Sequence, residues 1–451
     1  MNYAKTVEEL HLAHFSVKEY LLEQAQFDLE NASITISKTC LTYLTDIRGR
    51  HSTIRRDFPM ARYAAEYWMD YAVSAEASED IVRITVSFLR DETTFQRWCR
   101  LYQADHPLVE ESGPPRASRL YYACLGGLPW AARDLAIEGA DVNVQGGEYG
   151  NALQAASLRG GLEIVQLLLD EGADVNAQGG KYGSALQAAS YFGNLEIMQL
   201  LLDKGADVNA QGGYLGNALQ AASCKGNLDV IQLLLDKGAD VNMQGGLYGN
   251  ALQAASFNGN LEIMQLLLDK GAHINAQDVE YGNALQAASY EGNLEVVQLL
   301  LDKEADVNMQ GSLYGNALRA ASFNGNLEIM QLLLDKGADA DAQGGGYGTL
   351  QAALVKGNLE IVQLLLDKGA DANAQGGRYG NALQAASVEG NLEVVQLLLD
   401  KGADVDAQTL QAASHGGNRE IVQLLNLNGA KMMSRKRSSS TNRERTKLPR
   451  L

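Results

Sequence analysis

Residues 247–272 read LYGNALQAASFNGNLEIMQLLLDKGA, and residues 313–338 repeat that stretch with one change, from Gln253 to Arg319. Variants of the same phrase recur along most of the chain. The leucine of its A-L-Q-A-A motif returns at Leu120, Leu153, Leu186, Leu219, Leu252, Leu285, Leu318, Leu350, Leu383 and Leu410. Most of these spacings are 33 residues. A fixed period of this length predicts a solenoid of stacked units instead of a globule around one core.

Each unit predicts two antiparallel helices. In the quoted stretch, Asn250 is a suitable N-cap for a short apolar segment, residues 251–257, which Gly259 ends. We expect Asn260 to cap a second helix in the same way. The apolar face of that helix is made by Leu261, Ile263, Met264, Leu267 and Leu268.

A glycine follows the second helix, where a left-handed C-cap is expected; examples are Gly205, Gly238, Gly271 and Gly337. In one unit this place is held by Glu304. The pattern therefore predicts a non-glycine residue with positive φ, which costs on the order of 1 kcal/mol.

The remaining part of each unit, for example DVNAQGGKYG at 174–183, is polar and rich in glycine, which predicts an extended finger between helix pairs. With its two helices, the unit resembles an ankyrin repeat. The T-P-L-H-x-A phrase of that family appears here as N-A-L-Q-A-A, and G-H-L-E-I-V appears as G-N-L-E-I-V. The resemblance implies an all-α ankyrin-repeat solenoid of about ten helix-turn-helix units with β-hairpin-like fingers, over residues 119–430.

This chain departs from the family pattern at three framework positions, because Asn or Ser replaces Thr, Ala replaces Pro and Gln replaces His. We expect Asn and Gln to remake the hydrogen bonds that Thr and His supply in the family. Arg319 stands in one of these Gln positions and is expected to perturb the network locally. A tyrosine also recurs in the fingers, as in Tyr149 and Tyr182, and is expected to stack along them.

Residues 1–105 read mainly as helices and form a small helical domain, and the proline-rich stretch HPLVEESGPPRAS at 106–118 is the predicted linker. The phrases LHLAHFSVKEYLLE at 10–23, TCLTYL at 39–44 and FPMARYAAEYW at 58–68 resemble the segment that follows the nucleotide-binding NACHT module of fungal NLR-like proteins. In that family the segment often leads into ankyrin repeats.

The sequence contains no constellation typical of an enzyme. Its only Gly-Lys pair, Gly180-Lys181, is followed by Tyr182, so a P-loop is absent and no nucleotide is expected to bind by that device. His11 and His14 lie one helical turn apart but lack an evident third ligand, so no metal is expected. We therefore expect no enzymatic activity and no cofactor.

Charge and cysteine usage limit the class of protein. The net charge is -18, and residues 431–451 hold eight Lys/Arg and one Glu, or +7, which leaves -25 for the rest. An acidic body disfavours nucleic-acid binding. The four cysteines form no C-x-x-C pair, and no apolar run is long enough to span a membrane. A cytoplasmic protein without a membrane segment is expected, with a basic disordered tail over 431–451 that serves either nuclear import or solubility.

Comparison of the units with one another shows three variable positions, one in the finger and two at the end of the first helix. Several of the variable letters are aromatic, which favours a protein-binding surface over drift. In ankyrin-like stacks these positions line the concave side. The candidate partner-binding residues are Lys181, Tyr191, Phe192, Tyr214, Lys225, Leu247, Phe257, Asn258, Tyr290, Glu291, Leu313, Phe323, Asn324 and Arg378.

These observations favour a protein–protein interaction scaffold or ligand-sensing module, and the second resemblance implies a part in fungal NLR-like signalling. Two alternatives stay open: a C-terminal fragment of a NACHT nucleotide-switch receptor, and a nuclear adaptor directed by the basic tail.

Overall fold

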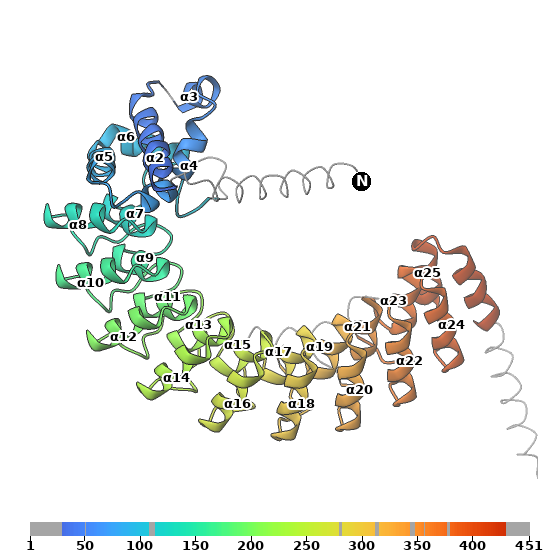
Figure 1. Ribbon diagram of the computed structural model, residues 1–451. Coiled ribbons are helices and arrows are strands. Elements are labelled where there is room, and N and C mark those ends of the chain that lie inside the picture. The colour runs from blue at the N-terminus through green and yellow to red at the C-terminus, as the bar shows by residue number, and fades with distance from the viewer. Residues whose placement is uncertain are drawn as a thin grey trace, which may run out of the picture. The chain divides into compact units, whose positions relative to one another are not determined.

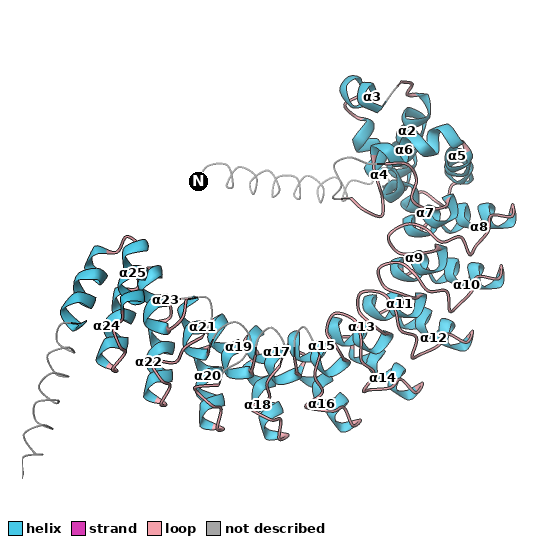
Figure 2. Ribbon diagram, turned by 180° about the vertical axis from the view of Figure 1, so that it is seen from behind, coloured by secondary structure: helices cyan, strands magenta, loops and turns pink. Residues whose placement is uncertain are grey.

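The computed structural model describes residues 29–49, 51–107, 113–278, 282–311, 315–342, 348–355, 357–376 and 379–429. The chain divides into two compact units, residues 1–221 and residues 222–451, and each is described by itself. Every named element in the described ranges is an α-helix, which confirms the all-α prediction (Figures 1 and 2).

The first unit begins with a group of helices that precedes the repeats. They are α2 (Leu29–Asp46), α3 (His51–Asp57), α4 (Ala61–Ser74), α5 (Glu79–Arg90) and α6 (Glu92–Leu101). Their core is aromatic: the ring of Trp68 lies 5.5 Å from Trp98 and 5.1 Å from Phe88, centroid to centroid. The indole nitrogen of Trp98 donates to the carbonyl of Ala65 at 2.9 Å, so this buried polar group is satisfied.

The first repeat packs on these helices across the predicted linker. Tyr122 lies 5.2 Å from the ring of Trp98, so side chains from both sides of residues 106–118 share one core. The carboxylate of Asp105 accepts from the Tyr121 hydroxyl at 3.4 Å and from the backbone nitrogen of Glu148 at 2.8 Å. The helical segment therefore covers the apolar face that the first repeat would otherwise expose, the task of a capping element in a solenoid.

In each unit the repeats form two layers of helices. The first helices are α7 (Arg119–Gly126), α9 (Ala152–Arg159), α11 (Ala185–Phe192), α13 (Ala218–Lys225), α15 (Ala251–Phe257), α17 (Ala284–Glu291), α19 (Ala317–Asn324), α21 (Thr349–Val355), α23 (Ala382–Glu389) and α25 (Ala407–His415). The second helices are α8 (Pro129–Ile137), α10 (Leu162–Asp170), α12 (Leu195–Asp203), α14 (Leu228–Asp236), α16 (Leu261–Asp269), α18 (Leu294–Asp302), α20 (Leu327–Asp335), α22 (Leu359–Asp367) and α24 (Leu392–Asp400), followed by helical residues 419–429. Within each unit, consecutive first helices pack closely, whereas consecutive second helices touch less (Figure 1).

The caps of the first helices match the prediction. The Asn250 side chain accepts from the backbone nitrogen of Gln253 at 2.8 Å, and α15 covers the predicted residues. Gly271 follows α16 with φ 89°, in the left-handed region. Glu304 has φ 66° in the equivalent place, and it is the one non-glycine with positive φ in the described part of the chain. This confirms the predicted strain.

The prediction for Asn260 is wrong, because its side chain does not cap α16. It donates instead to the carbonyl of Ser223 at 3.1 Å, at the end of the first helix of the preceding repeat. Asn194 bonds Ser157 in the same way at 2.8 Å. The reason is that the last carbonyls of a helix lack intrahelical donors, and a side-chain amide from the next repeat satisfies them.

The fingers have the predicted hairpin-like form. They are closed by isolated antiparallel bridges such as Gly179 with Gly183, whose N–H···O distance is 2.8 Å. Neighbouring fingers also bond to each other: the nitrogen of Lys181 donates to Glu148, and the nitrogen of Tyr214 donates to Lys181, both at 2.8 Å. These bonds satisfy backbone groups that would otherwise depend on water.

The Gln of each framework phrase joins one repeat to the next. Buried Gln154 accepts from the nitrogen of Asn151 at 2.7 Å, and its amide donates to Gly179 at 3.1 Å and Gly183 at 2.8 Å in the following finger. Gln187 reaches its own next finger with equivalent bonds. The expected hydrogen bonds of Asn and Gln are therefore present, and they satisfy buried polar groups in this chain.

The repeat that carries Arg319 differs from its near-copy. Arg319 is buried, with 7% of its surface exposed. The hydroxyl of Ser322 donates to Thr349 of the next repeat at 3.0 Å, whereas the equivalent Ser256 donates to Leu252 of its own helix at 2.7 Å. The Asn316 side chain still accepts from the nitrogen of Arg319 at 2.7 Å, as Asn250 does from Gln253 at 2.8 Å, so the cap of the near-copy is retained and the effect of Arg319 on the bonds to the next finger stays a prediction.

Candidate functional site

The variable residues lie where the first helices end beside the fingers, a surface called here the first-helix face. In the first unit, Tyr191 and Phe192 end α11 and contact the finger residue Tyr182, with ring centroids 5.1 and 5.7 Å apart. Tyr191 and Phe192 also contact each other at 5.1 Å in an edge-to-face arrangement. These three rings form one aromatic cluster.

The finger tyrosine is the base of this cluster. Tyr182 is buried, and its ring stacks on that of Tyr149 with centroids 5.9 Å apart and planes 13° apart. Burial raises the pKa of the Tyr182 phenol, which therefore stays neutral. The predicted stacking of finger tyrosines is confirmed for this pair. The sequence predicts only a packing role for Tyr182 and not its contact with the variable residues, although Tyr-Gly stands just before most of the first helices.

The second unit repeats the arrangement with smaller groups. The rings of Tyr248 and Phe257 lie 5.2 Å apart, so a finger tyrosine again contacts the end of its own first helix. Tyr290 stacks on Phe323 of the next repeat, with centroids 6.3 Å apart and planes 22° apart. Aromatic contacts therefore occur both within a repeat and between repeats on this face.

The predicted site residues differ in how much surface they expose. Phe192 is 46% exposed and Tyr214 is 55% exposed, which makes them the two large exposed aromatics of this set. Half-buried members are Tyr191, Leu247, Phe257, Tyr290 and Phe323. Exposed polar members are Lys181, Lys225, Asn258, Glu291 and Asn324. Leu313 and Arg378 lie outside the described residues.

Some polar members of the set are engaged in structural contacts. The Asn324 amide donates to Tyr290 of the preceding repeat at 2.6 Å, whereas the Asn258 amide donates to Ala254 of its own helix at 2.9 Å. The ammonium of Lys181 lies 3.5 Å from the Glu148 carboxylate. A partner that used these groups would compete with bonds that already exist, so the aromatic members are the better anchors.

No group of three or more His, Cys, Asp or Glu side chains that could hold a metal occurs among the described residues. His11 and His14 lie outside them, as does the basic segment 431–451. No helix in the described ranges is both long and apolar enough to cross a bilayer. Cys124 is fully buried, and burial raises the pKa of its thiol, which makes it unreactive.

Known proteins resemble the repeat region. A family model described as ankyrin repeats in three copies matches residues 120–212, 215–278, 252–344, 284–376, 317–409 and 349–436. A protein of Monascus ruber named azaphilone pigments biosynthesis cluster protein L is 38% identical over an alignment of 192 residues, and the match covers 35% of this chain and 40% of that protein. The chain thus spans less than half the length of this relative.

A solved structure, that of the human ASB11 ankyrin repeat domain, is similar with 26% sequence identity and a TM-score of 0.42. The similarity covers 49% of this chain and 98% of that domain. The family match begins at residue 120, so it gives the helices before α7 no family assignment.

Proposed function

The chain belongs to the ankyrin-repeat family, and from that membership we propose that it is a non-enzymatic scaffold that captures a protein partner on its first-helix face. The observation that carries the proposal is the cluster of Tyr182, Tyr191 and Phe192, in which Phe192 is 46% exposed. Aromatic side chains that are held in place and partly exposed are the residues that most often anchor protein interfaces.

The arrangement of the cluster favours binding in a second way. Tyr191 has two fixed aromatic neighbours, so its ring is already ordered before a partner arrives. A pre-ordered side chain loses little conformational entropy on association, which is a main cost of binding. The buried Tyr182 therefore acts as a positioning residue, and Phe192 supplies contact area.

The experiment replaces Tyr191, Phe192, Phe257 and Phe323 with Ala and measures which proteins are captured from an extract, by quantitative mass spectrometry. We expect the specific partners to fall at least tenfold. The matched control is Leu195→Ala with Leu228→Ala, two similarly exposed positions on the second helices. If the aromatic variant stays folded and captures the same proteins as the control, the first-helix face is not the binding surface.

For the wider role we propose sensing or scaffolding in fungal NLR-like signalling, within the cytoplasm. Support comes from the phrases TCLTYL and FPMARYAAEYW, which lie in and around the mutually packed helices α2 and α4, and from the fungal source of the relative. A P-loop module encoded in the reading frame before Met1 would instead make the chain part of a nucleotide-switch receptor.

A nuclear adaptor is a second candidate, because residues 431–451 carry eight Lys/Arg and one Glu. Imaging of the tagged chain with and without these residues separates the two: nuclear accumulation that disappears with the segment would favour the adaptor.

A further inference from the structure

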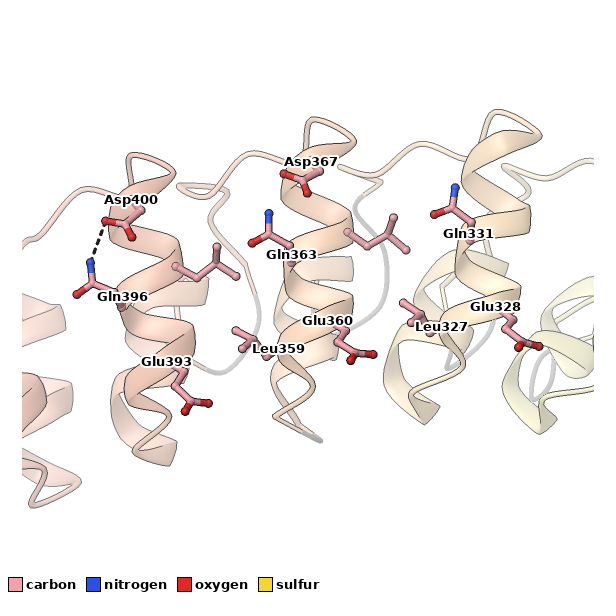
Figure 3. Close-up of a pocket in the computed structure, with 12 residues that line it drawn as sticks. Leu327, Glu328, Gln331, Leu359, Glu360, Gln363, Asp367, Glu393, Gln396 and Asp400 are labelled. Atoms are coloured by element: carbon pink, nitrogen blue, oxygen red, sulfur yellow. Dashed lines mark hydrogen bonds between the residues drawn. The ribbon is translucent and has the colours of Figure 1, made fainter.

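A groove runs over three consecutive second helices of the second unit, α20, α22 and α24, and is called here the second-helix groove. Its volume is about 920 Å³, and Leu327, Leu359, Leu364 and Leu397 provide its apolar lining. Figure 3 shows the side chains of Glu328, Glu360 and Glu393 in a row at one end of the three helices. The groove therefore combines an apolar bed with an acidic edge.

The acidic groups of the groove lack neutralising partners. Glu328, Glu360 and Glu393 are exposed, and no Lys or Arg of the described chain lies within 4.0 Å of their carboxylates. At the opposite end of the helices, Asp335 pairs with Lys368 at 2.8 Å and Asp367 with Lys401 at 2.6 Å.

This ladder of ion pairs stops at Asp400. The position that holds lysine in the other repeats of the second unit is Asn428 after Asp400, so among the described residues this carboxylate receives a bond from Gln396 at 2.8 Å but no ion pair with lysine (Figure 3). The groove is thus left with negative charge at both ends of α24.

The last described residues lie near the loop that follows α24, one of the three helices of the groove. A Cβ placed on Gly429 would lie 3.8 Å from Val405, five residues beyond the end of α24. The 22 residues from 430 to 451 can extend up to ~70 Å at ~3.3 Å per residue. Three neighbouring helices spaced ~10 Å apart span ~30 Å, so the segment can reach the whole groove.

We propose that the basic segment 431–451 docks in the second-helix groove of its own chain. Its eight Lys/Arg complement the unpaired carboxylates, and Leu448 and Leu451 complement the leucines of the bed. Attachment to the same chain gives an effective concentration in the millimolar range, so even weak contacts are populated.

The docked segment would have a regulatory consequence. It covers the groove, so that other basic ligands cannot bind there. Its own Lys/Arg are at the same time unavailable to other partners. Phosphate groups on Ser438, Ser439 or Ser440 would each add about -1.5 to -2 charge and repel the groove carboxylates. Modification of these serines would therefore release the segment.

Limited digestion with trypsin tests the proposal in the full chain, because a docked segment is cleaved slowly. The variant replaces Glu328, Glu360 and Glu393 with Gln, and mass spectrometry measures the rate of cleavage after Arg435, Lys436 and Arg437. We expect at least a threefold faster rate than in the wild type. The matched control replaces Glu163, Glu196 and Glu262 with Gln, at the same position of α10, α12 and α16. Equal cleavage rates in the two variants would overturn the proposal.

A zero-length carbodiimide crosslink distinguishes the occupants of the groove. It joins lysine to a neighbouring carboxylate, and the sample mixes ¹⁵N-labelled with unlabelled protein. We expect links from Lys436 or Lys447 to Glu360 or Glu393 within one isotopic population. Links of mixed isotope would show that a second copy fills the groove, and equal yields at Glu163 and Glu196 would show nonspecific attraction. Either result contradicts docking within the chain.

Discussion

Glu304 adopts a backbone conformation that is unfavourable for a non-glycine residue. Its φ of 66° lies in the region that glycine adopts freely, and the other repeats keep glycine there, for example Gly337 with φ 91°. An L-residue in this region costs on the order of 1 kcal/mol. The strain follows from the cap geometry at the end of α18, which the helix pair imposes whatever the residue is.

We predict that Glu304→Gly stabilises the protein by about 1 kcal/mol, and thermal denaturation measures this as a higher melting temperature. The reverse change, Gly337→Glu, is the matched control, because an added Cβ there meets no atom within 4 Å and only the backbone strain remains. It should lower the melting temperature. A lower or unchanged value for Glu304→Gly would contradict the strain.

Glu76 is a second residue in an unfavourable environment, because its ionisable carboxyl group is buried. Its carboxylate accepts from the nitrogens of Trp130 at 3.0 Å and Ala131 at 3.3 Å, and so caps α8. Burial raises the pKa of Glu76 from 4.5 to about 7, although these two N–H groups act in the opposite direction. A raised pKa means that the folded state favours the protonated acid, so its stability contribution is full below pH 4.5 and is lost as the pH rises through 7.

We therefore predict that Glu76→Gln matches the wild type near pH 4.5 and exceeds it at pH 8, by up to about 3 kcal/mol. Glutamine keeps an acceptor for the two N–H groups but does not ionise. Urea denaturation at both pH values measures the difference, with Glu79→Gln, an exposed carboxylate in α5, as the control for the loss of one charge. A pH-independent difference between Glu76→Gln and the wild type would refute the burial argument.

At the scale of the elements, the helices and their caps could be predicted because they depend on residues near in sequence. Asn250 and the glycine at 259 define α15 through contacts within its own turn. The role of Asn260 could not be predicted in this way, because its acceptor is Ser223, 37 residues away in the preceding repeat. The periodicity of the sequence predicts on which surface such a residue lies, but it does not identify the atom with which its side chain forms a hydrogen bond.

The same limit applies to the candidate site. The variable positions could be found by comparing repeats, and the end of α11 is where the structure places Tyr191 and Phe192. Their contact with Tyr182 required the finger to fold back over the helix end, which follows from backbone bonds between neighbouring fingers. No local pattern carries that information.

The joint between finger and helix gives a prediction at this scale. Gln187 is buried and donates to Gly216 at 2.7 Å and Gly212 at 3.1 Å in the next finger, so Gln187→Ala removes both bonds between the repeats and leaves the half-buried Gly212 carbonyl without this donor. We expect a loss of about 2–3 kcal/mol in the free energy of unfolding. Gln199→Ala is the matched control, because Gln199 is on the surface and bonds only Asp203, and it should cost less than ~0.5 kcal/mol. Chemical denaturation compares the two, and equal losses would show that the joint contributes nothing.

At the scale of the whole molecule, repetition makes stability a sum of terms within repeats and between neighbours. The period of 33 residues was sufficient to predict this architecture. The identity of a partner was not predictable. The residues that recur from repeat to repeat reveal the fold, whereas recognition of a partner depends on the few residues that differ between repeats. The contacts of Trp98 and Glu76 with the first repeat were also not predictable from the sequence, because these two residues belong to no repeat.

The bonds between repeats have one further consequence, for how such a chain changes in length. The amide of Gln154 meets a carbonyl 29 residues ahead, and so does that of Gln187. Each donor thus finds its acceptor at a constant offset. Recombination that inserts or removes whole 33-residue periods in frame leaves every joint intact, while a change in length between a donor and its acceptor alters this offset. The near-identity of residues 247–272 and 313–338, two periods apart, is the mark that such an exchange would leave.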